Sequence, residues 1–473
     1  MAADNNDSNT KPLKIVFIHL DLGIGGAEQL VLQLATAGQQ LGHSVELITT
    51  RCDADHCFAA VAPGGSLADC VTIYGNWIPP TIGGMGQALL STLRILYLTI
   101  QVLRCHEVDV CVVDVLPTSL PLLRWMSNAA TFFYCHFPDK LLLRSSSSTG
   151  SSLKQLYRSV LDAMEAFTMT FADLIVVNSQ FTKTTVQATF TSLAHQEMPI
   201  LYPALDTSNN TTQQQSQQAK TSQSPIVSLN RFERKKNIAL VIQAYQYLKE
   251  TYPDQTLPPL IVAGGYDTKN VENVEYRGEL QTLVNETQLQ SIVTFQCDIS
   301  DVERSRLFQT ALGVVYTPDK EHFGIVPLEA MYAGTPVLAV RSGGPMETVV
   351  DGVTGFLRSP TPQDFGEALL QWIQDPSKAT EMGQKGKKHV EAKFGTKRLE
   401  QEFQALLEKA LEHKEQSTLH LTLWSKVGVY LLDALYAILA AVFLTLLLQT
   451  VGVLHPNESI LGGIKRSWSD GEL

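Results

Sequence analysis

The sequence predicts an α/β protein with two domains, each built on a parallel sheet. Short runs of β-branched and aromatic residues alternate with amphipathic helical segments along most of the chain, as is typical of parallel sheets. A polar stretch at residues 207–224, rich in Asn, Thr, Gln and Ser, interrupts this alternation near the middle. The length of 473 residues accommodates two domains of ordinary size together with further segments.

Strands in the first half of the chain are predicted where short apolar runs end at loops. They fall at residues 14–19, 45–49 and 108–113, within 131–139, and at the start of 174–182. After the first strand, Asp21 to Glu28 (DLGIGGAE) is a glycine-rich turn into a helix. Its backbone N–H groups can approach an anion, so Gly25 and Gly26 are candidate ligand contacts, although a tight turn without a ligand explains them too. A dinucleotide fingerprint requires a glycine where Glu28 stands, which argues against a nicotinamide enzyme.

The segment from Leu89 to Val102 is strongly apolar and is predicted to be a helix. It carries one charge, Arg94, and is too short to span a bilayer comfortably. We expect it to belong to the core. The alternative is a helix in a membrane surface, with Trp77 and Tyr97 at the interface.

Strands in the second half are expected at residues 225–229, 260–265, 292–295, 313–316 and 336–340. The loop after the first of these, Asn230 to Asn237 (NRFERKKN), is basic and precedes an amphipathic helix. Arg231 and Lys236 supply a planar fork and a point charge at a strand-to-helix junction, which suits a diphosphate. We interpret Arg234 and Lys235 of the same loop as solvated cations.

Two glutamates flank an apolar run within Tyr316 to Gly344, a strand–loop–helix–strand unit that implies a parallel pair of strands. Pro327 suits the first turn of its helix, and Gly334 suits the position just past the helix end. Glu321 in the loop and Glu329, expected in the first helical turn, belong to the sheet edge where open parallel sheets bind ligands. Spacing alone favours simpler interpretations, a solvated loop residue and a carboxylate that suits the helix dipole.

The composition excludes several classes of protein. The net charge of −11, without a basic half, argues against a nucleic-acid partner. Seven cysteines are scattered along the chain without a C-x-x-C pair, so we expect reduced thiols in the cytosol. Cys52, His56 and Cys57 lack the spacing of a zinc site. The polar, acidic N-terminus lacks the basic and apolar regions of a signal peptide.

The stretch EHFGIVPLE, which contains both glutamates, closely resembles the donor-site signature of the retaining glycosyltransferases of family 4. Further segments match that family in the same order, namely DLGIGGAE, FYCHFPD, VNSQFT, NRFERKKN and VAGGYD. The resemblance covers roughly residues 14 to 400. Within the family, these segments are most similar to enzymes that use GDP-mannose to add α-1,3 and α-1,6 mannoses to a dolichol-pyrophosphate-linked Man-GlcNAc2 during assembly of the N-glycan precursor.

This resemblance implies the GT-B fold, in which two doubly wound, Rossmann-like α/β domains face each other across a cleft. Residues 1–206 would form the acceptor-side domain, residues 207–224 a low-complexity linker, and residues 225–415 the domain that binds the nucleotide sugar. Helices within residues 364–411 would cross back to the first domain.

The resemblance also implies which residues form the site. Arg231, Lys236 and Glu329 would hold the donor on the second domain, while Gly25 and Gly26 approach it from the first. The residues expected to be catalytic are Glu321, His136 and Lys236. The acceptor would attack from the face that the leaving group departs from, and the departing phosphate would take its proton.

Neither a metal nor another cofactor is expected. Asp53-Ala-Asp55 is therefore interpreted as a chance match to the D-x-D metal pattern of other glycosyltransferases. The cations would stabilise charge on the leaving diphosphate, and Glu321 would orient the mannose and stabilise positive character at its anomeric carbon.

Residues 424–454 are predicted to be a membrane segment, followed by a tail at 455–473. Val427 to Leu448 is apolar apart from Asp433 and is long enough for about 30 Å of helix, as a single anchor or a shallow hairpin. Together with a dolichol-linked acceptor, this segment predicts a protein of the endoplasmic reticulum membrane with its catalytic domains facing the cytosol. Other mannosyltransferases of the same pathway are candidate partners.

Two other functions are compatible with the sequence. One is a family 4 enzyme with another lipid acceptor, such as a phosphoinositide, because the acceptor is recognised by loops without a readable signature. The other is a non-catalytic, membrane-bound nucleotide-sugar binder. The presence of Glu321, Lys236 and His136 argues against that second function, since a protein without activity needs no such set.

Overall fold

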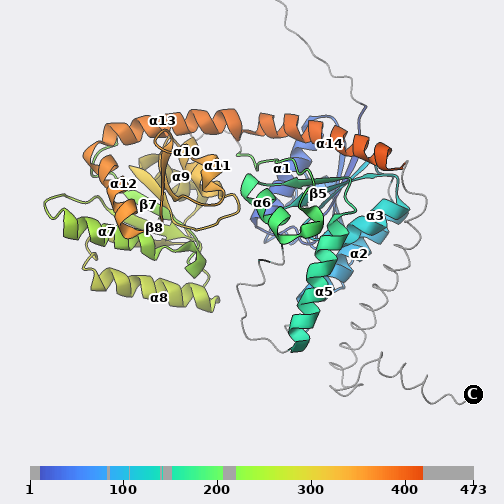
Figure 1. The fold of residues 1–473 in the computed structure, drawn as a ribbon, viewed down its shortest axis with the longest axis horizontal. Helices are drawn as coiled ribbons and strands as arrows, with labels where there is room; N and C mark the ends of the chain where they lie inside the picture. Colours follow the sequence, from blue (N-terminus) through green and yellow to red (C-terminus); the bar gives the residue numbers. More distant parts are fainter. Residues whose placement is uncertain are drawn as a thin grey trace, which may run out of the picture.

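The computed structural model describes residues 11–82, 86–105, 107–138, 141, 152–205 and 220–418. Two α/β domains lie side by side, and a pair of long helices runs along one edge of both (Figure 1). The predicted membrane segment at 424–454 and the tail at 455–473 lie outside the described residues. Within the described part of the chain, no helix combines the length and apolar character needed to cross a membrane.

The first domain is built on a six-stranded parallel sheet with the order β3-β2-β1-β4-β5-β6. Its strands are β1 (Lys14–Ile18), β2 (Ser44–Thr49), β3 (Val71–Ile73), β4 (Val110–Asp114), β5 (Ala130–Cys135) and β6 (Leu174–Val177). Five of them were predicted. The edge strand β3 was not.

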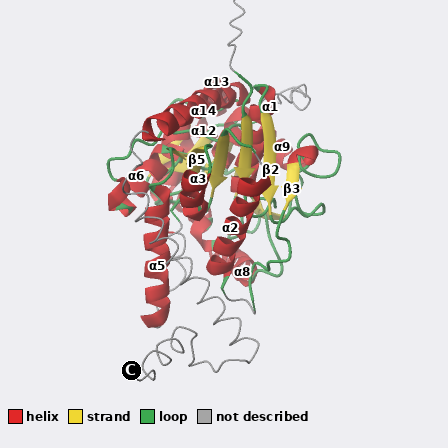
Figure 2. Ribbon diagram, turned by 90° about the vertical axis from the view of Figure 1, so that its right-hand side faces the viewer, coloured by secondary structure: helices red, strands yellow, loops and turns green. Residues whose placement is uncertain are grey.

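Helices cover both faces of this sheet. They are α1 (Gly26–Gln40), α2 (Gln87–Cys105), α3 (Leu120–Met126), α5 (Ser152–Met169), α6 (Gln180–Thr189) and α14 (Thr396–Thr418). Side chains of a strand point alternately to the two faces, so Ile15 and Phe17 pack against α1 and α14, whereas Val16 and Ile18 pack toward α2 and α3. Figure 2 shows α1 and α14 above the strands, and α2 and α5 below them.

The apolar segment at 89–102 lies within α2 and belongs to the core, as expected. Ile95 and Leu98 are fully buried against the first sheet. Trp77 is 74 % exposed and lies edge-on against Tyr97, with ring centroids 5.8 Å apart.

The second domain repeats the same topology, with the order β12-β11-β10-β7-β8-β9. Its strands are β7 (Ile226–Leu229), β8 (Leu260–Gly264), β9 (Val293–Cys297), β10 (Gly313–Tyr316), β11 (Val337–Val340) and β12 (Gly355–Arg358). All were predicted except β12. Its helices are α7 (Ala239–Thr251), α8 (Val271–Glu286), α9 (Asp301–Thr310), α10 (Ile325–Tyr332), α11 (Pro345–Thr348), α12 (Pro362–Gln374) and α13 (Pro376–Lys393).

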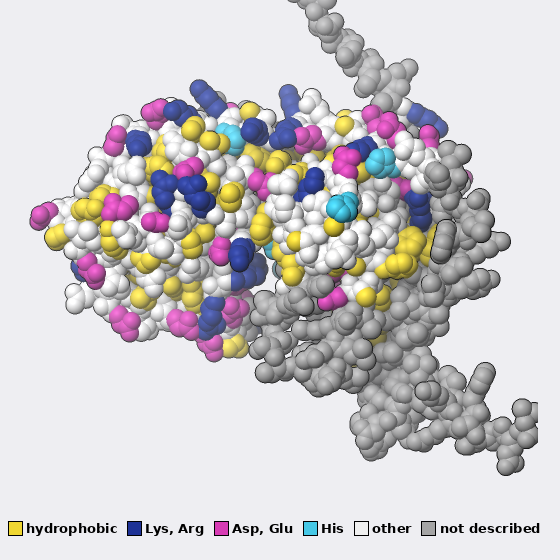
Figure 3. Space-filling model, in the orientation of Figure 1, with side chains coloured by type: hydrophobic (Ala, Val, Ile, Leu, Met, Phe, Trp, Pro, Cys, Tyr) yellow, Lys and Arg dark blue, Asp and Glu magenta, His cyan; other side chains and the backbone are white. Residues whose placement is uncertain are grey.

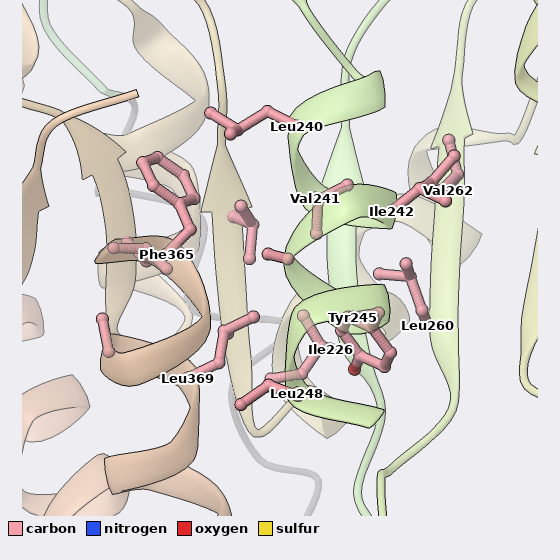
Figure 4. Packing of buried hydrophobic residues seen from close by; sticks show 14 of the residues in the cluster. Ile226, Leu240, Val241, Ile242, Tyr245, Leu248, Leu260, Val262, Phe365 and Leu369 are labelled. Atoms are coloured by element: carbon pink, nitrogen blue, oxygen red, sulfur yellow. The ribbon is translucent and has the colours of Figure 1, made fainter. Parts of the chain in front are cut away.

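The core of the second domain is densest between α7, α12 and the sheet (Figure 4). Val241, Tyr245 and Leu248 of α7 and Phe365 and Leu369 of α12 are all fully buried there. The opposite face of the sheet packs against α9, α10 and α13. The sheet is therefore buried on both sides, which explains the continuous apolar character of its strands.

The last helices cross back to the first domain, as the sequence predicted. Phe403 of α14 lies between Phe17 and Phe132, with ring centroids 6.4 and 5.8 Å away, and Leu407 is fully buried in the same cluster. The core of the first domain is thus completed by residues from the far end of the chain (Figure 1).

The end of the predicted linker is packed rather than free. Residues 207–219 lie outside the described part of the chain, but the Lys220 ammonium donates to the Gly334 carbonyl at 2.9 Å and to the Thr335 hydroxyl at 2.6 Å. Burial lowers the pKa of Lys220 to about 7. The C-terminal end of this polar stretch is therefore attached to the second domain, because the Lys220 ammonium finds acceptors just after α10.

In both sheets the strand order reverses beside the first strand, between β1 and β4 and between β7 and β10. Ligands of doubly wound sheets bind outside the carboxyl ends of the strands at such reversals, called switch points. The two switch points of this chain contribute residues to one cavity between the domains.

Candidate active site

A cavity of about 980 Å³ lies between the domains. Its walls include Gly26 and His136 from the first domain and Arg231, Lys236 and Glu321 from the second. In Figure 3, Lys and Arg side chains gather on the second domain close to its boundary with the first. An anionic ligand in the cleft would therefore meet positive charge on its second-domain side.

Lys236 is placed at the second switch point by a short helical turn, Arg234–Lys236, which follows β7. The next residue, Asn237, has a φ of 47° and ends that turn in the left-handed region. The Thr317 hydroxyl, just after β10, donates to the Lys236 carbonyl at 2.6 Å. These contacts join the loops after β7 and β10 and fix the base of the lysine side chain.

The Lys236 ammonium lies 2.5 Å from the Glu321 carboxylate, and both side chains are mostly buried. Burial alone would raise the pKa of Glu321, but the Lys236 charge and hydrogen bond hold it below the ordinary value. The glutamate is therefore an anion at neutral pH. The Tyr316 hydroxyl is a further hydrogen-bond partner of this carboxylate.

The Glu321 loop rests on the tight loop Ser342-Gly343-Gly344. The Gly344 N–H donates to the Glu321 carbonyl at 2.8 Å. Gly343 has a φ of 61°, and a Cβ there would stand 2.3 Å from the same carbonyl. Only glycine fits that approach, so this loop fixes the backbone that carries Glu321.

The cations of the basic loop differ in their surroundings. Arg231 lines the cavity and pairs with Glu233 at 3.1 Å, with 63 % of its side chain exposed and able to move onto a ligand. Lys235 also pairs with Glu233, at 3.0 Å, and is 68 % exposed. Arg234 turns away from the cavity to the acidic residues of α8, so it is an ion-paired surface residue rather than a free cation.

Glu329 was expected in the first helical turn, but it lies beyond that turn. It is the fifth residue of α10, and its carboxylate pairs with Arg304 of α9. Burial raises the pKa of Glu329 despite this cation. Arg304 lines the cavity and was missed by the sequence analysis, because no motif marks it within α9.

His136 follows β5 and is tied to the first switch point. Its Nε2 lies 3.2 Å from the Asp114 carboxylate at the end of β4, and Asp114 also meets Nδ1 of His19 at 2.8 Å. Neither Asp114 nor His19 was singled out in the sequence, since each reads there as an ordinary strand-end residue.

The two glycines of the glycine-rich turn differ in position. Gly26 lines the cavity, and a Cβ there would meet nothing within 4 Å. Gly25 precedes α1 in an extended conformation, and a Cβ there would lie 2.3 Å from the Glu28 carboxylate. That carboxylate therefore lies over Gly25 at the start of α1, where the sequence predicted that both glycines contact an anionic ligand.

Direct contacts hold the domains together beside the cavity. The Glu347 carboxylate of the second domain accepts hydrogen bonds from the Gln180 and Phe181 N–H groups at 2.8 and 3.0 Å, at the start of α6. The Tyr202 hydroxyl donates to it at 2.9 Å. The Ser179 hydroxyl donates to the His322 carbonyl at 2.7 Å. We call this set of hydrogen bonds between the domains the latch.

Ionisable groups gather at the cavity, but no cluster of three or more His, Cys, Asp or Glu suited to a metal occurs among the described residues. The chemistry that these residues can perform is recognition of an anionic group by Lys236 and Arg231, with an ionised carboxylate beside it. The absence of a metal requirement stays a prediction.

Comparison with solved structures shows the class of protein. Sucrose-phosphate synthase from Thermosynechococcus elongatus superimposes with a TM-score of 0.63 at 20 % identity, covering 84 % of this chain and 98 % of that one. The catalytic domain of starch synthase IV from Arabidopsis thaliana gives 0.60 at 13 % identity, covering 85 % and 100 %. The chain has the GT-B fold that the sequence predicted.

Comparison with family models and relatives shows the family. Residues 24–209 match the model described as glycosyltransferase family 4, and residues 209–389 match glycosyl transferases group 1. The human α-1,3/1,6-mannosyltransferase ALG2 is 42 % identical over 82 % of this chain and 94 % of its own. The Rhizomucor pusillus protein of the same name is 37 % identical over 92 % and 98 %.

The chain is therefore a glycosyltransferase. It belongs to the ALG2 family of α-1,3/1,6-mannosyltransferases. This membership confirms the predicted mannosyltransferase role in assembly of the N-glycan precursor.

Proposed function

We propose that the chain transfers mannose from GDP-mannose, with retention, to dolichol-pyrophosphate-linked Man-GlcNAc2, forming first an α-1,3 and then an α-1,6 linkage. The observation that carries the proposal is the Lys236–Glu321 pair at the second switch point, with Arg231 on the same wall of the cavity. Membership of the ALG2 family supports mannose as the transferred sugar.

The order of the strands in the second sheet suggests where each part of the donor binds along the edge of that sheet. Lys236 and Arg231 would bind the diphosphate after β7, and Glu321 after β10 would contact the mannose. The nucleobase would extend the other way along the sheet edge, toward β8 and β9. Asp298 and Asp301 line the cavity on that side. Carboxylates accept hydrogen bonds, so they suit the two adjacent donors on the edge of guanine better than the single donor of uracil.

The mechanism follows from the charges that face the cavity. As the bond between mannose and diphosphate lengthens, negative charge grows on the phosphate next to Lys236 and Arg231, where preorganised cations lower the barrier most. Positive character grows on the anomeric carbon, and ionised Glu321 stabilises it. The acceptor hydroxyl attacks from the side of the leaving phosphate and gives its proton to that phosphate. No side chain then has to act as base.

We further propose that the protein resides in the endoplasmic reticulum membrane with both catalytic domains in the cytosol. The apolar residues 427–448 support attachment to a membrane. The scattered cysteines support a reducing compartment, and Cys52, Cys57, Cys70, Cys111 and Cys297 are free thiols.

The deciding experiment supplies the full-length protein with GDP-mannose and pyrophosphate-linked Man-GlcNAc2 and identifies the products by mass and linkage. We expect products with one and two added mannoses, formed much more slowly by the Glu321→Gln protein. Transfer from a UDP-sugar but not from GDP-mannose would refute GDP-mannose as the donor. Transfer from GDP-mannose to a phosphoinositide but not to the oligosaccharide would refute the proposed acceptor.

A further inference from the structure

Two consecutive side chains between β6 and α6 contact both walls of the cavity. The Asn178 amide donates to the His136 carbonyl at 2.9 Å, and the Ser179 hydroxyl donates to the His322 carbonyl at 2.7 Å. Both side chains are buried, with residue exposures of 7 % and 0 %. His136 belongs to the wall from the first domain, and His322 directly follows Glu321 in the wall from the second. One dipeptide therefore holds the backbone of both loops that carry predicted catalytic residues.

A ring stack joins the same two loops. Phe137 directly follows His136, and its ring lies nearly parallel to the His322 ring, with centroids 3.6 Å apart and 11° between the planes. Each ring thus belongs to the neighbour of a predicted catalytic residue. Because Ser179 and Phe137 reach His322 from separate segments of the first domain, the Glu321 loop is held against that domain at two points.

Ser179 is itself fixed by helix α6. Its oxygen accepts the Thr182 N–H at 3.0 Å as the N-cap of that helix. The hydroxyl has one proton to donate, and its shortest bond is the one to His322, since Asn178 Oδ1 and Thr182 Oγ1 lie 3.0 Å away. An N-cap requires only the bond to the helix N–H. Capping therefore does not explain the contact with the second domain.

We propose that Asn178, Ser179 and Phe137 are positioning residues. They set the distance and orientation of His136 relative to Glu321 across the cavity. The inference rests on the proposed function, in which both of these residues act on the mannose. A displacement of about 1 Å at a reacting centre lowers a rate by about 100-fold. Contacts that fix this spacing therefore matter for catalysis, although they touch no substrate.

Donor binding should depend on this spacing much less than catalysis does. Lys236 and Arg231, which we propose bind the diphosphate, both belong to the second domain. The Glu347 bonds of the latch also differ from the Ser179 bond, because they reach the start of α6 and Tyr202 and not a neighbour of a catalytic residue. Loss of the positioning contacts should therefore lower kcat, whereas loss of the Glu347 bonds should raise KM.

The test compares Ser179→Ala, Asn178→Ala and Phe137→Leu with the natural full-length protein in steady-state kinetics with GDP-mannose and the pyrophosphate-linked acceptor. We expect each variant to lower kcat by about ten-fold or more, with a KM for GDP-mannose within about three-fold of the original. Ser179→Thr keeps the hydroxyl, so its kcat should stay within about three-fold of the original. A normal kcat in Ser179→Ala, or a loss confined to KM, would refute the inference.

A double-mutant cycle tests whether the two side chains act together. If Asn178 and Ser179 set one distance, the protein that carries both alanines should have a kcat little below that of the worse single variant. A loss equal to the product of the two single losses would mean that the contacts act independently, and it would overturn the shared role.

Thr361→Ala is the matched control. Thr361 is the N-cap of α12 and accepts the Asp364 N–H at 3.1 Å, but it is not among the residues that line the cavity. We expect this variant to lower thermal stability through the lost cap and to leave kcat unchanged. If Ser179→Ala fails to fold, Phe137→Leu decides the question, because it leaves the cap of α6 intact.

Hydrogen exchange of the ligand-free protein gives a measurement that needs no substrate. Amides of residues 320–324 should exchange faster in Ser179→Ala and Phe137→Leu than in the natural protein, and at the natural rate in Thr361→Ala. Unchanged exchange in that loop would refute the inference. A natural protein that does not turn over GDP-mannose would instead refute the proposed function, so the two failures are distinguishable.

Discussion

The ammonium of Lys236 and the carboxylate of Glu321 stand 2.5 Å apart, on loops that leave two neighbouring strands of the second sheet. In the absence of a ligand, each group compensates the charge of the other inside a mostly buried site. A diphosphate bound as we propose would compete with Glu321 for Lys236. Binding would then leave the carboxylate beside the sugar with less compensation, which would strengthen its interaction with positive charge at the anomeric carbon.

The first prediction concerns the cations. Lys236→Ala and Arg231→Ala should each lower kcat by about 100-fold or more, because they remove charge that stabilises the leaving diphosphate. Lys235→Ala is the matched control, since Lys235 is 68 % exposed and is not among the residues that line the cavity. Steady-state kinetics with GDP-mannose decides it. An essential Lys235 beside a dispensable Lys236 would show that the loop contacts the donor in another register.

The second prediction separates the two carboxylates. Glu321→Gln should lower kcat with little change in donor KM, because its charge acts on the transition state. Glu329→Gln should mainly raise the donor KM, because Glu329 orients Arg304 at the cavity wall. Initial rates at varied GDP-mannose measure both. A Glu321→Gln protein with normal kcat would mean that the catalytic centre lies elsewhere.

The third prediction concerns the latch between the domains. Glu347→Ala removes two hydrogen bonds to backbone N–H groups, each of about 1.5–3 kcal/mol when the acceptor is charged. We expect more open conformations, seen as a larger radius of gyration in small-angle scattering, and higher KM values for both substrates. Glu381→Ala is the control, because Glu381 pairs only with Lys385 on the surface of α13. Equal scattering curves for the two variants would count against the latch.

The fourth prediction concerns pH and stability. The pKa of His19 is raised, so its contribution is complete below the unfolded value of about 6.5 and is lost as pH rises toward about 10. The pKa of Asp114 is lowered, so its contribution is lost as pH falls from about 3.8 toward 2. The apparent Tm of the natural protein should exceed that of His19→Asn most between about pH 4 and 6.5. A difference that grows above pH 8 would contradict this linkage.

The fifth prediction concerns topology. Asn285 lies exposed in the last turn of α8 within a glycosylation sequon, and Asn209 and Asn210, in sequons outside the described residues, belong to a polar stretch. A cytosolic location predicts that none carries a glycan in cells. Asn457 should stay bare as well, because it follows the predicted membrane segment by only a few residues in the sequence. Endoglycosidase treatment of microsomal protein should leave its gel mobility unchanged. A glycan mapped to Asn285 would place the second domain in the lumen.

Much of the fold was predictable from local sequence. Ten of the twelve strands are apolar runs that end at glycine, proline or polar residues, and each lies where that pattern predicts it. The two that were missed are edge strands. β3 has only three residues, too few for a pattern, and β12 (GFLR) begins with glycine and ends with arginine. β3 is also only partly buried, whereas β12 is largely buried and was missed because its four residues include a glycine and an arginine.

The site was predictable where function coincides with a local motif. Lys236, Glu321 and His136 lie in segments that resemble the family, and the structure brings all three to one cavity. Arg304 and Asp114 could not be found in this way. Arg304 pairs with Glu329 and Asp114 with His136, and such pairings between separate elements appear only when the domain is assembled.

The packing of α14 into the first domain has a consequence for how the chain acquires its structure during synthesis. A ribosome releases the N-terminal residues first, and domains commonly fold in that order. Here the first sheet emerges early but lacks Phe403 and Leu407, which fill the space over Phe17 and Phe132. The second domain is synthesised in between and can complete its own sheet sooner. The nascent first domain therefore presents an unfilled apolar face until nearly the whole catalytic region has been translated.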